Sequence, residues 1–339
     1  IDWFHPLCEA FIAGAVSLGI PRNPDYNGAT QEGVSYAQRT IHKGRRVSSA
    51  TAFLKPARGR KNLSIRANAH TTGIVLDGKR AVGVRYSLGG RRGDDKEIRC
   101  RREVIVSSGT YGTPQILQLS GIGAPELLSA HGIVVRHALK GVGEGLQDHY
   151  APRTVARVKN TDTINERVRG LKLWKEAAAY ALTRRGILAI SPTLVYVFWH
   201  SGVSPERSDL QLTFTPASYQ EGVQGKLEKL PGMTVAAWQQ RPESRGWVRI
   251  ATSDPFAAPL IQTNYLAEEI DRRTMIAGMR LARRLLRTEA LAPYYESEEF
   301  PGPQNESDDE LLAAATTRAQ TTFHPGCSCR MGPASDPLA

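Results

Sequence analysis

One histidine stands in a setting suited to proton transfer. His324 precedes Pro325 in the glycine-containing stretch 324–332. An imidazole has an ordinary pKa of about 6.5, so it can accept a proton from an alcohol at neutral pH. Loss of that proton lets hydride leave the adjacent carbon. His324 is therefore a candidate general base for alcohol oxidation, and the alternative is a structural or surface histidine.

Two cysteines follow this histidine, at Cys327 and Cys329. Their single-residue spacing and the lack of a second Cys/His pair argue against a closed zinc site, so we expect no metal. The chain has four cysteines, too few and too unevenly placed for a disulfide framework. A reducing compartment, the cytoplasm, is the expected location, and peripheral membrane association is the alternative.

A glycine-rich segment, 109–123, suggests how a ligand could be approached. Val104–Ser108 reads as a buried strand that runs into Gly109, and a helix is expected to begin near Thr113-Pro114. Gly109 permits close approach to a ligand, and the run 120–123 would end the helix in a tight turn. Strand, glycine turn and helix together are typical of an α/β nucleotide-binding fold.

The remaining predicted elements are a hairpin, three helices and three further strands. Residues 62–86 alternate as strands around an Asp77-Gly78 turn, which predicts a hairpin. Helices are predicted at 174–183, at 268–291 with its arginines facing outward, and from the Ser307/Glu310 capping box to about 320. Strands are predicted at 210–214, 233–239 and 246–250. This order fits a mainly antiparallel sheet with helices across one face.

Composition narrows the class of protein. The 339 residues are 41% hydrophobic and 23% charged, which is ordinary for a globular chain of about two domains. The formal charge of +11 is dispersed, and its clusters are not interleaved with aromatic residues, so we expect no nucleic-acid partner. No apolar run approaches the ~20 residues that span a bilayer, so we expect no transmembrane segment.

The segment Gly109–Gly123 resembles the second signature of the FAD-dependent glucose-methanol-choline (GMC) oxidoreductases, in their bacterial choline dehydrogenase-like branch. The other stretches that resemble the family are 27–33, 44–50, 62–66, 141–149, 241–246 and 324–332. The resemblance implies that FAD is the cofactor and that a small-molecule alcohol is oxidised to an aldehyde or ketone by hydride transfer to flavin. It leaves the electron acceptor open.

The same resemblance assigns roles to individual residues. It implies that His324 is catalytic and that Thr71 and Gly109 bind the cofactor. Tyr196 and Phe198 are candidate substrate-pocket residues, and the alternative is that they form a buried face of a sheet.

The sequence departs from the family pattern in three places. Gly326-Cys327-Ser328-Cys329 replaces x-Gly-Thr-Cys, which bears on the geometry of the loop. Gly145 stands where asparagine is usual. Leu194–Phe198 replaces a stretch that carries a glutamate in close choline dehydrogenases, and a quaternary ammonium site favours a carboxylate beside its aromatic residues.

The sequence thus predicts an α/β FAD-binding (Rossmann-like) domain over 1–150 and an α+β substrate domain over 151–300. A return segment, 301–339, would carry the histidine. The absence of a Gly-x-Gly-x-x-Gly turn and of a second catalytic residue suggests a chain truncated at both ends. Two alternatives to alcohol oxidation stay open: a hydroxynitrile lyase-like member of the fold, and a catalytically inactive fragment.

Overall fold

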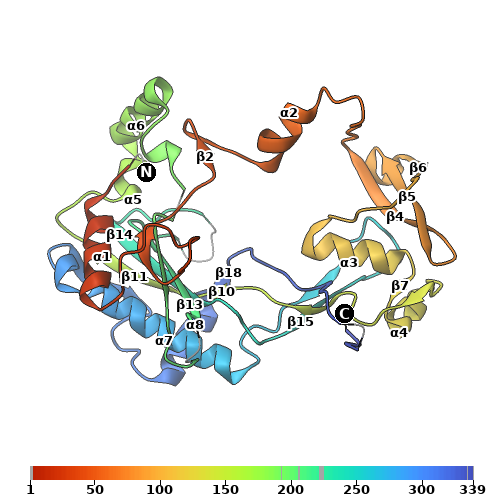
Figure 1. Ribbon diagram of the computed structural model, residues 1–339. Helices are drawn as coiled ribbons and strands as arrows, with labels where there is room; N and C mark the ends of the chain where they lie inside the picture. Colours follow the sequence, from red (N-terminus) through yellow and green to blue (C-terminus); the bar gives the residue numbers. More distant parts are fainter. Residues whose placement is uncertain (1–2, 192, 205–206, 221–224, 334, 339) are drawn as a thin grey trace. The chain divides into compact units, whose positions relative to one another are not determined.

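The computed structural model describes residues 3–191, 193–204, 207–220, 225–333 and 335–338 (Figure 1). The chain divides into two compact units, each assembled from separate stretches of sequence. The first unit comprises 1–60, 149–241 and 269–322, and the second comprises 61–148, 242–268 and 323–339.

The first unit is built on a six-stranded antiparallel sheet with the order β1-β12-β13-β14-β11-β17. Its strands are β1 (Gly33–Tyr36), β11 (Arg153–Val158), β12 (Val195–Trp199), β13 (Leu210–Thr215), β14 (Gly232–Gln239) and β17 (Tyr295–Phe300). β-Branched and aromatic residues dominate the inner strands, as expected for a pleated surface that is largely buried. The strands predicted at 210–214 and 233–239 are confirmed.

Helices α1 (Pro6–Ser17) and α7 (Glu269–Leu286) pack against the strands of this sheet (Figure 1). Alternate strand residues such as Val195 and Val197 enter the core that the helices cover, because successive side chains point to opposite faces. Phe11 of α1 stacks on Phe214 of β13 with ring centroids 4.3 Å apart. The predicted antiparallel sheet with helices across one face is confirmed.

Helix α7 differs in two respects from its prediction. It ends at Leu286, and a short 3-10 helix, η4 (Glu289–Leu291), follows it. The expectation that its arginines face outward is wrong for Arg283, whose side chain is 11% exposed and pairs with the buried Glu298 at 2.7 Å. Arg283 also donates to two backbone carbonyls, so its charge is satisfied inside the fold.

The other elements of the first unit are short or lie along the chain between strands. Helix α6 (Gly170–Thr183) begins four residues before the predicted Trp174, and α8 (Asp308–Arg318) is opened by the predicted capping box of Ser307 and Glu310. The remaining elements are β2 (Ile41–His42), β3 (Arg45–Arg46), η1 (Ala50–Leu54), α2 (Lys55–Ala57), α5 (Ile164–Arg167), η3 (Ile187–Ala189), β10 (Tyr150–Ala151) and β18 (Gln320–Thr321). Strands β10 and β18 pair with each other.

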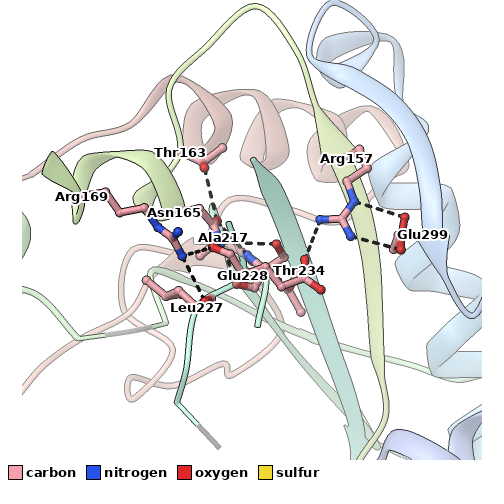
Figure 2. A network of polar contacts seen from close by, with 10 residues as sticks. Arg157, Thr163, Asn165, Arg169, Ala217, Leu227, Glu228, Thr234 and Glu299 are labelled. Atoms are coloured by element: carbon pink, nitrogen blue, oxygen red, sulfur yellow. Dashed lines mark hydrogen bonds and ion pairs between the residues drawn. The ribbon is translucent and has the colours of Figure 1, made fainter. Parts of the chain in front are cut away.

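A network of polar contacts fixes residues 217–218 and 227–228 to the sheet (Figure 2). Arg157 of β11 pairs with Glu228 at 2.6 Å and with Glu299 at 3.1 Å. The buried amide of Asn165 donates to the carbonyls of Ser218 and Glu228 and accepts from the Ser218 N–H. The Glu228 N–H also donates to the Ser218 carbonyl, and Arg169 also donates to the Glu228 carbonyl, so the polar backbone groups of this buried loop are satisfied.

Asn165→Ala should therefore lower the free energy of unfolding by about 2–3 kcal/mol, because it leaves the buried Ser218 N–H without its acceptor and removes one of the two donors to the Ser218 and Glu228 carbonyls. Urea unfolding of the purified chain measures this. Asn27→Ala is the matched control, since that amide is exposed and bonds only a side chain, Gln38. An equal loss in both variants would contradict the role assigned to Asn165.

The second unit contains a three-stranded antiparallel sheet of β4 (Ala69–Asp77), β5 (Arg80–Leu88) and β6 (Asp94–Arg99), with η2 (Gly90–Arg92) between the last two strands. Asp77 pairs with Arg80 across a two-residue turn, and Gly78 has a φ of +56°. The predicted hairpin is confirmed, although no strand forms at 62–66. Helix α3 (Gly109–Leu119) packs against β4.

A second three-stranded sheet in this unit combines β9 (Glu144–Leu146), β15 (Gly246–Arg249) and β16 (Leu260–Gln262). The strand predicted at 246–250 therefore exists, but it does not join the six-stranded sheet. Two parallel strands, β7 (Ile122–Gly123) and β8 (His137–Ala138), flank α4 (Pro125–Ala130).

The prediction of a buried strand at Val104–Ser108 is wrong. These residues form no strand, and Ile105 is 79% exposed. A strand is defined by hydrogen bonds to a neighbouring strand, and none of the described strands lies beside this segment. Helix α3 also begins at Gly109, earlier than the expected Thr113-Pro114.

Candidate active site

The loop that carries His324 is held at its first residue by a buried carboxylate. The His324 N–H donates to Asp148 Oδ1 at 3.1 Å, and the other oxygen of Asp148 accepts from the Tyr265 hydroxyl. Asp148 is 6% exposed, whereas the His324 residue is exposed. The carboxylate thus orients the backbone and leaves the imidazole accessible.

The next residues of the loop are anchored on the start of helix α3. The Thr110 hydroxyl donates to the Pro325 carbonyl at 2.7 Å, and the Ser328 hydroxyl donates to the Thr110 carbonyl at 2.6 Å. Gln147 and Gly326 exchange backbone hydrogen bonds of 3.1 and 2.9 Å. The structure therefore brings together three motifs that the sequence identified separately: 109–123, 141–149 and 324–332.

A proline explains the bond between Ser328 and Thr110. Pro114 lies inside helix α3 and has no N–H to donate to the carbonyl four residues earlier, which is that of Thr110. The Ser328 hydroxyl supplies the missing donor. Ser328, which is 2% exposed, was not among the predicted site residues. The only sign of its role in the sequence was a hydroxyl-bearing residue four positions after His324.

The departures from the family pattern in this loop have a conformational meaning. Cys327 occupies the position of the usual glycine, and it keeps a left-handed backbone with a φ of +68°. That conformation costs a non-glycine residue about 1–2 kcal/mol. Ser328 stands where threonine is usual and keeps the hydroxyl. The turn is therefore retained at some cost in stability.

Gly145, which replaces the usual asparagine, has a φ of +78°. Glycine and asparagine are the residues that adopt this conformation most easily. A Cβ at this position would lie 3.7 Å from its nearest neighbour, the Cys327 carbonyl oxygen, so either residue fits. This substitution is conformationally neutral.

The predicted cofactor-binding residues lie in the same unit as the histidine loop. Gly109 is the first residue of α3, has a φ of +75°, and has open space where a Cβ would be. Thr71 is a half-buried residue of β4 opposite Tyr86. The cofactor-binding roles of both residues remain predictions.

Tyr196 and Phe198 belong to the first unit, on the face of β12 opposite the helix-covered core. Their rings lie 5.7 and 5.2 Å from the ring of Tyr26. Phe198 is buried, and burial raises the pKa of the Tyr196 hydroxyl, which therefore stays protonated at neutral pH. A small aromatic cluster thus lies on this face of the sheet, and its role as a pocket remains a prediction.

A second histidine, His149, lies in the first unit, whereas His324 lies in the second. Its Nε2 is 2.9 Å from the Gln240 carbonyl oxygen, and its ring stacks on Trp238 with centroids 6.0 Å apart. These contacts give His149 a structural environment.

Neither a metal cluster nor a membrane span is found in the described part of the chain. Its His, Cys, Asp and Glu side chains form no group of three suited to a metal ion, and Cys327 and Cys329 are free thiols. None of its helices has the length and apolar character to cross a bilayer.

Comparison with family models defines the class of protein. Family models of GMC oxidoreductase match residues 2–151, for the N-terminal part, and 242–339, for the C-terminal part. The chain belongs to the GMC oxidoreductase family.

The relatives agree with this assignment. The oxygen-dependent choline dehydrogenase of Staphylococcus aureus (strain MSSA476) is 35% identical over 335 residues, which cover 99% of this chain and 58% of that protein. Formate oxidase from Aspergillus oryzae RIB40, in its R554A variant, superposes with a TM-score of 0.87 at 25% identity, covering 97% of this chain and 61% of that one. Pyridoxine 4-oxidase from Mesorbium loti superposes with a TM-score of 0.85 at 24% identity, covering 100% and 62%. The chain thus spans about 58% of the length of the curated relative.

Proposed function

We propose that this protein takes part in the FAD-dependent oxidation of an alcohol to an aldehyde or ketone. The observation that carries the proposal is the anchoring of the His324 loop on Asp148 and on the start of helix α3. Side chains fix two backbone groups of the loop, a third loop residue is fixed through its own hydroxyl, and the His324 residue is exposed. A general base needs this combination of fixed position and access to its substrate.

In this proposal His324 accepts the hydroxyl proton of the alcohol on an imidazole nitrogen. Asp148 positions the histidine through the backbone, and Thr110 and Ser328 hold the loop that follows. FAD, when bound, supplies the acceptor for the hydride that leaves the alcohol carbon. Which small-molecule alcohol is used and which electron acceptor reoxidises the flavin are open.

The residues present fit FAD in part. The start of α3 offers a positive helix terminus and, at Gly109, a bare backbone with open space above it. Thr71 lies in the hairpin of the same unit. A Gly-x-Gly-x-x-Gly turn, which holds a pyrophosphate in dinucleotide-binding folds, does not occur in the 339 residues.

The 339-residue chain should therefore copurify with little or no FAD, because Gly109 and Thr71 cover only part of such a ligand. The absorption spectrum of the purified protein measures this directly. Stoichiometric flavin would overturn the expectation, and it would also exclude the alternative that the chain is an inactive fragment unable to hold its cofactor.

The function itself is tested in a chimera that joins this chain to the segments of the S. aureus relative lying outside the match. Anaerobic addition of an alcohol should bleach the flavin. Cleavage of a cyanohydrin without bleaching would favour the hydroxynitrile lyase-like alternative. The relatives reported above are a dehydrogenase and oxidases, and they give that alternative no support.

Choline is one candidate alcohol, since the S. aureus relative is a choline dehydrogenase. The aromatic cluster of Tyr26, Tyr196 and Phe198 is of the kind that binds a quaternary ammonium. We keep Tyr196 and Phe198 as proposed pocket residues. A cytoplasmic location, consistent with the four free cysteines, and the domain boundaries near 150 and 300 are further parts of the proposal.

A further inference from the structure

The first unit contains a small hollow beside the outer strands of its six-stranded sheet. It has a volume of about 190 Å³, several times the ~30 Å³ that one water occupies. The residues that line it are Arg153, Val155, Tyr219, Gln220, Phe300, Thr317, Arg318, Ala319 and Gln320. Two of these residues are cations and none is an acid.

Arg153 is the central charge of this hollow. Its guanidinium lies over the ring of Tyr219, 5.4 Å from the centroid, and one nitrogen is 3.4 Å from the Gln320 side-chain oxygen. No carboxylate of the described residues pairs with it. Burial lowers the pKa of Arg153, which means that its charge is held away from water without a full partner.

Arg157, four residues along the same strand and on the same face, shows the contrast. It pairs with both Glu228 and Glu299, and these carboxylates, together with their hydrogen bonds, raise its pKa despite burial. Buried charges in proteins are normally paired in this way because desolvation is costly. Among the described residues, Arg153 has no carboxylate partner of the kind that Arg157 has, and it lines the hollow instead.

Arg318 adds a second positive charge to the lining. Its guanidinium lies over the ring of Phe300, 4.4 Å from the centroid. The pKa of Glu299 is lowered chiefly by its hydrogen bond to Arg157 and, to a smaller extent, by the charge of Arg318. Gln220, Gln320 and Thr317 supply neutral polar groups around the two arginines. The described lining thus offers hydrogen-bond donors around the charge of Arg153.

We propose that this hollow binds a small carboxylate, held chiefly by the guanidinium of Arg153. The planar fork of arginine matches the two oxygens of a carboxylate, and the charge-assisted bonds replace the water that burial has removed. The carboxylate has two possible sources. It is either part of an alcohol substrate, in which case the inference rests on the proposed function, or a separate molecule.

Binding is tested on the 339-residue chain at low ionic strength with acetate and glycolate as probes and ethylene glycol as the neutral match. Saturation-transfer NMR gives the affinities, and thermal unfolding gives an independent readout. Acetate and glycolate should bind saturably and raise the melting temperature, and ethylene glycol should do neither. Binding should weaken as salt is added.

Arg153→Gln should weaken the binding of acetate and glycolate at least about tenfold. Arg153→Lys should weaken their binding less, because lysine keeps the charge but loses the planar fork of arginine. Without ligand, Arg153→Gln should not lower the melting temperature, since it removes a desolvated charge. Arg185→Gln is the matched control. It removes the same charge from an exposed residue that does not line the hollow, and it should leave binding unchanged.

Equal binding of acetate by the parent and Arg153→Gln, equal binding of ethylene glycol and glycolate, or no carboxylate binding at all would overturn the proposal. The Arg153→Gln substitution in the chimera distinguishes the two sources. If it lowers kcat/KM for glycolate but not for ethanol, the bound carboxylate is part of the substrate. Unchanged values for both, with acetate binding lost, identify a separate one. Carboxylate binding without turnover of any alcohol would contradict only the proposed function.

Discussion

Replacing His324 by alanine should slow anaerobic flavin reduction in the flavin-loaded chimera by roughly 10²- to 10⁴-fold, the usual contribution of a positioned acid-base group. The flavin should remain bound. The melting temperature should change little, because His324 is exposed and contributes its backbone N–H, which alanine keeps, to the bond with Asp148. Stopped-flow absorbance with an alcohol substrate measures the rate.

His149→Ala is the internal control. That imidazole contacts the Gln240 carbonyl and stacks on Trp238, so its loss should lower stability more than turnover. A His324→Ala enzyme that reduces its flavin within threefold of the parent, about 0.7 kcal/mol, would remove His324 from the mechanism. A lowered melting temperature with near-normal turnover would mark His324 as structural instead.

Gln118→Met should lower the free energy of unfolding by about 3–5 kcal/mol, the largest stability effect expected in the second unit. The buried amide of Gln118 donates to the carbonyls of Val142 and Val248, each at 3.1 Å, and accepts from the Ile250 N–H at 2.8 Å. Methionine fills the same space but leaves three buried backbone groups without a partner. Urea unfolding measures the loss.

Gln115→Met in the same helix is the matched control. Gln115 is only partly buried and makes one bond, to the Ala257 carbonyl at 2.7 Å, so its loss should cost about 1 kcal/mol. If the two variants lose the same stability, the cost comes from methionine on this helix and the proposed role of Gln118 is wrong.

Local patterns predicted those features of the fold that neighbouring residues determine. The hairpin at Asp77-Gly78 depends on a left-handed glycine, the start of α8 on the Ser307/Glu310 capping box, and the buried face of α7 on helical spacing. In each case the residues that decide the conformation are adjacent in the chain.

The errors arise where distant residues decide. Val104–Ser108 has the composition of a buried strand, but strand formation depends on a partner that composition does not supply. The strand at Gly246–Arg249 was recognised, yet its partners, β9 and β16, were not. Arg283 looked like a surface arginine because its partner, Glu298, lies on a strand beyond the end of the helix.

The sequence predicted individual motifs of the candidate site but not the hydrogen bonds between them. The histidine and the two glycine-containing motifs were identified, but the bonds that join them link residues far apart in sequence, such as Asp148 with His324 and Thr110 with Ser328. The roles of Asp148 and Ser328 therefore became visible only in three dimensions.

The bond from Ser328 to Thr110 also constrains which residues can replace one another during evolution. A hydroxyl at position 328 is required only because Pro114 leaves a helix carbonyl without its donor. With a different residue at 114, that carbonyl would find its donor within the helix, and alanine at 328 would cost less. The two positions are therefore epistatic, and the cost of a substitution at either depends on the other.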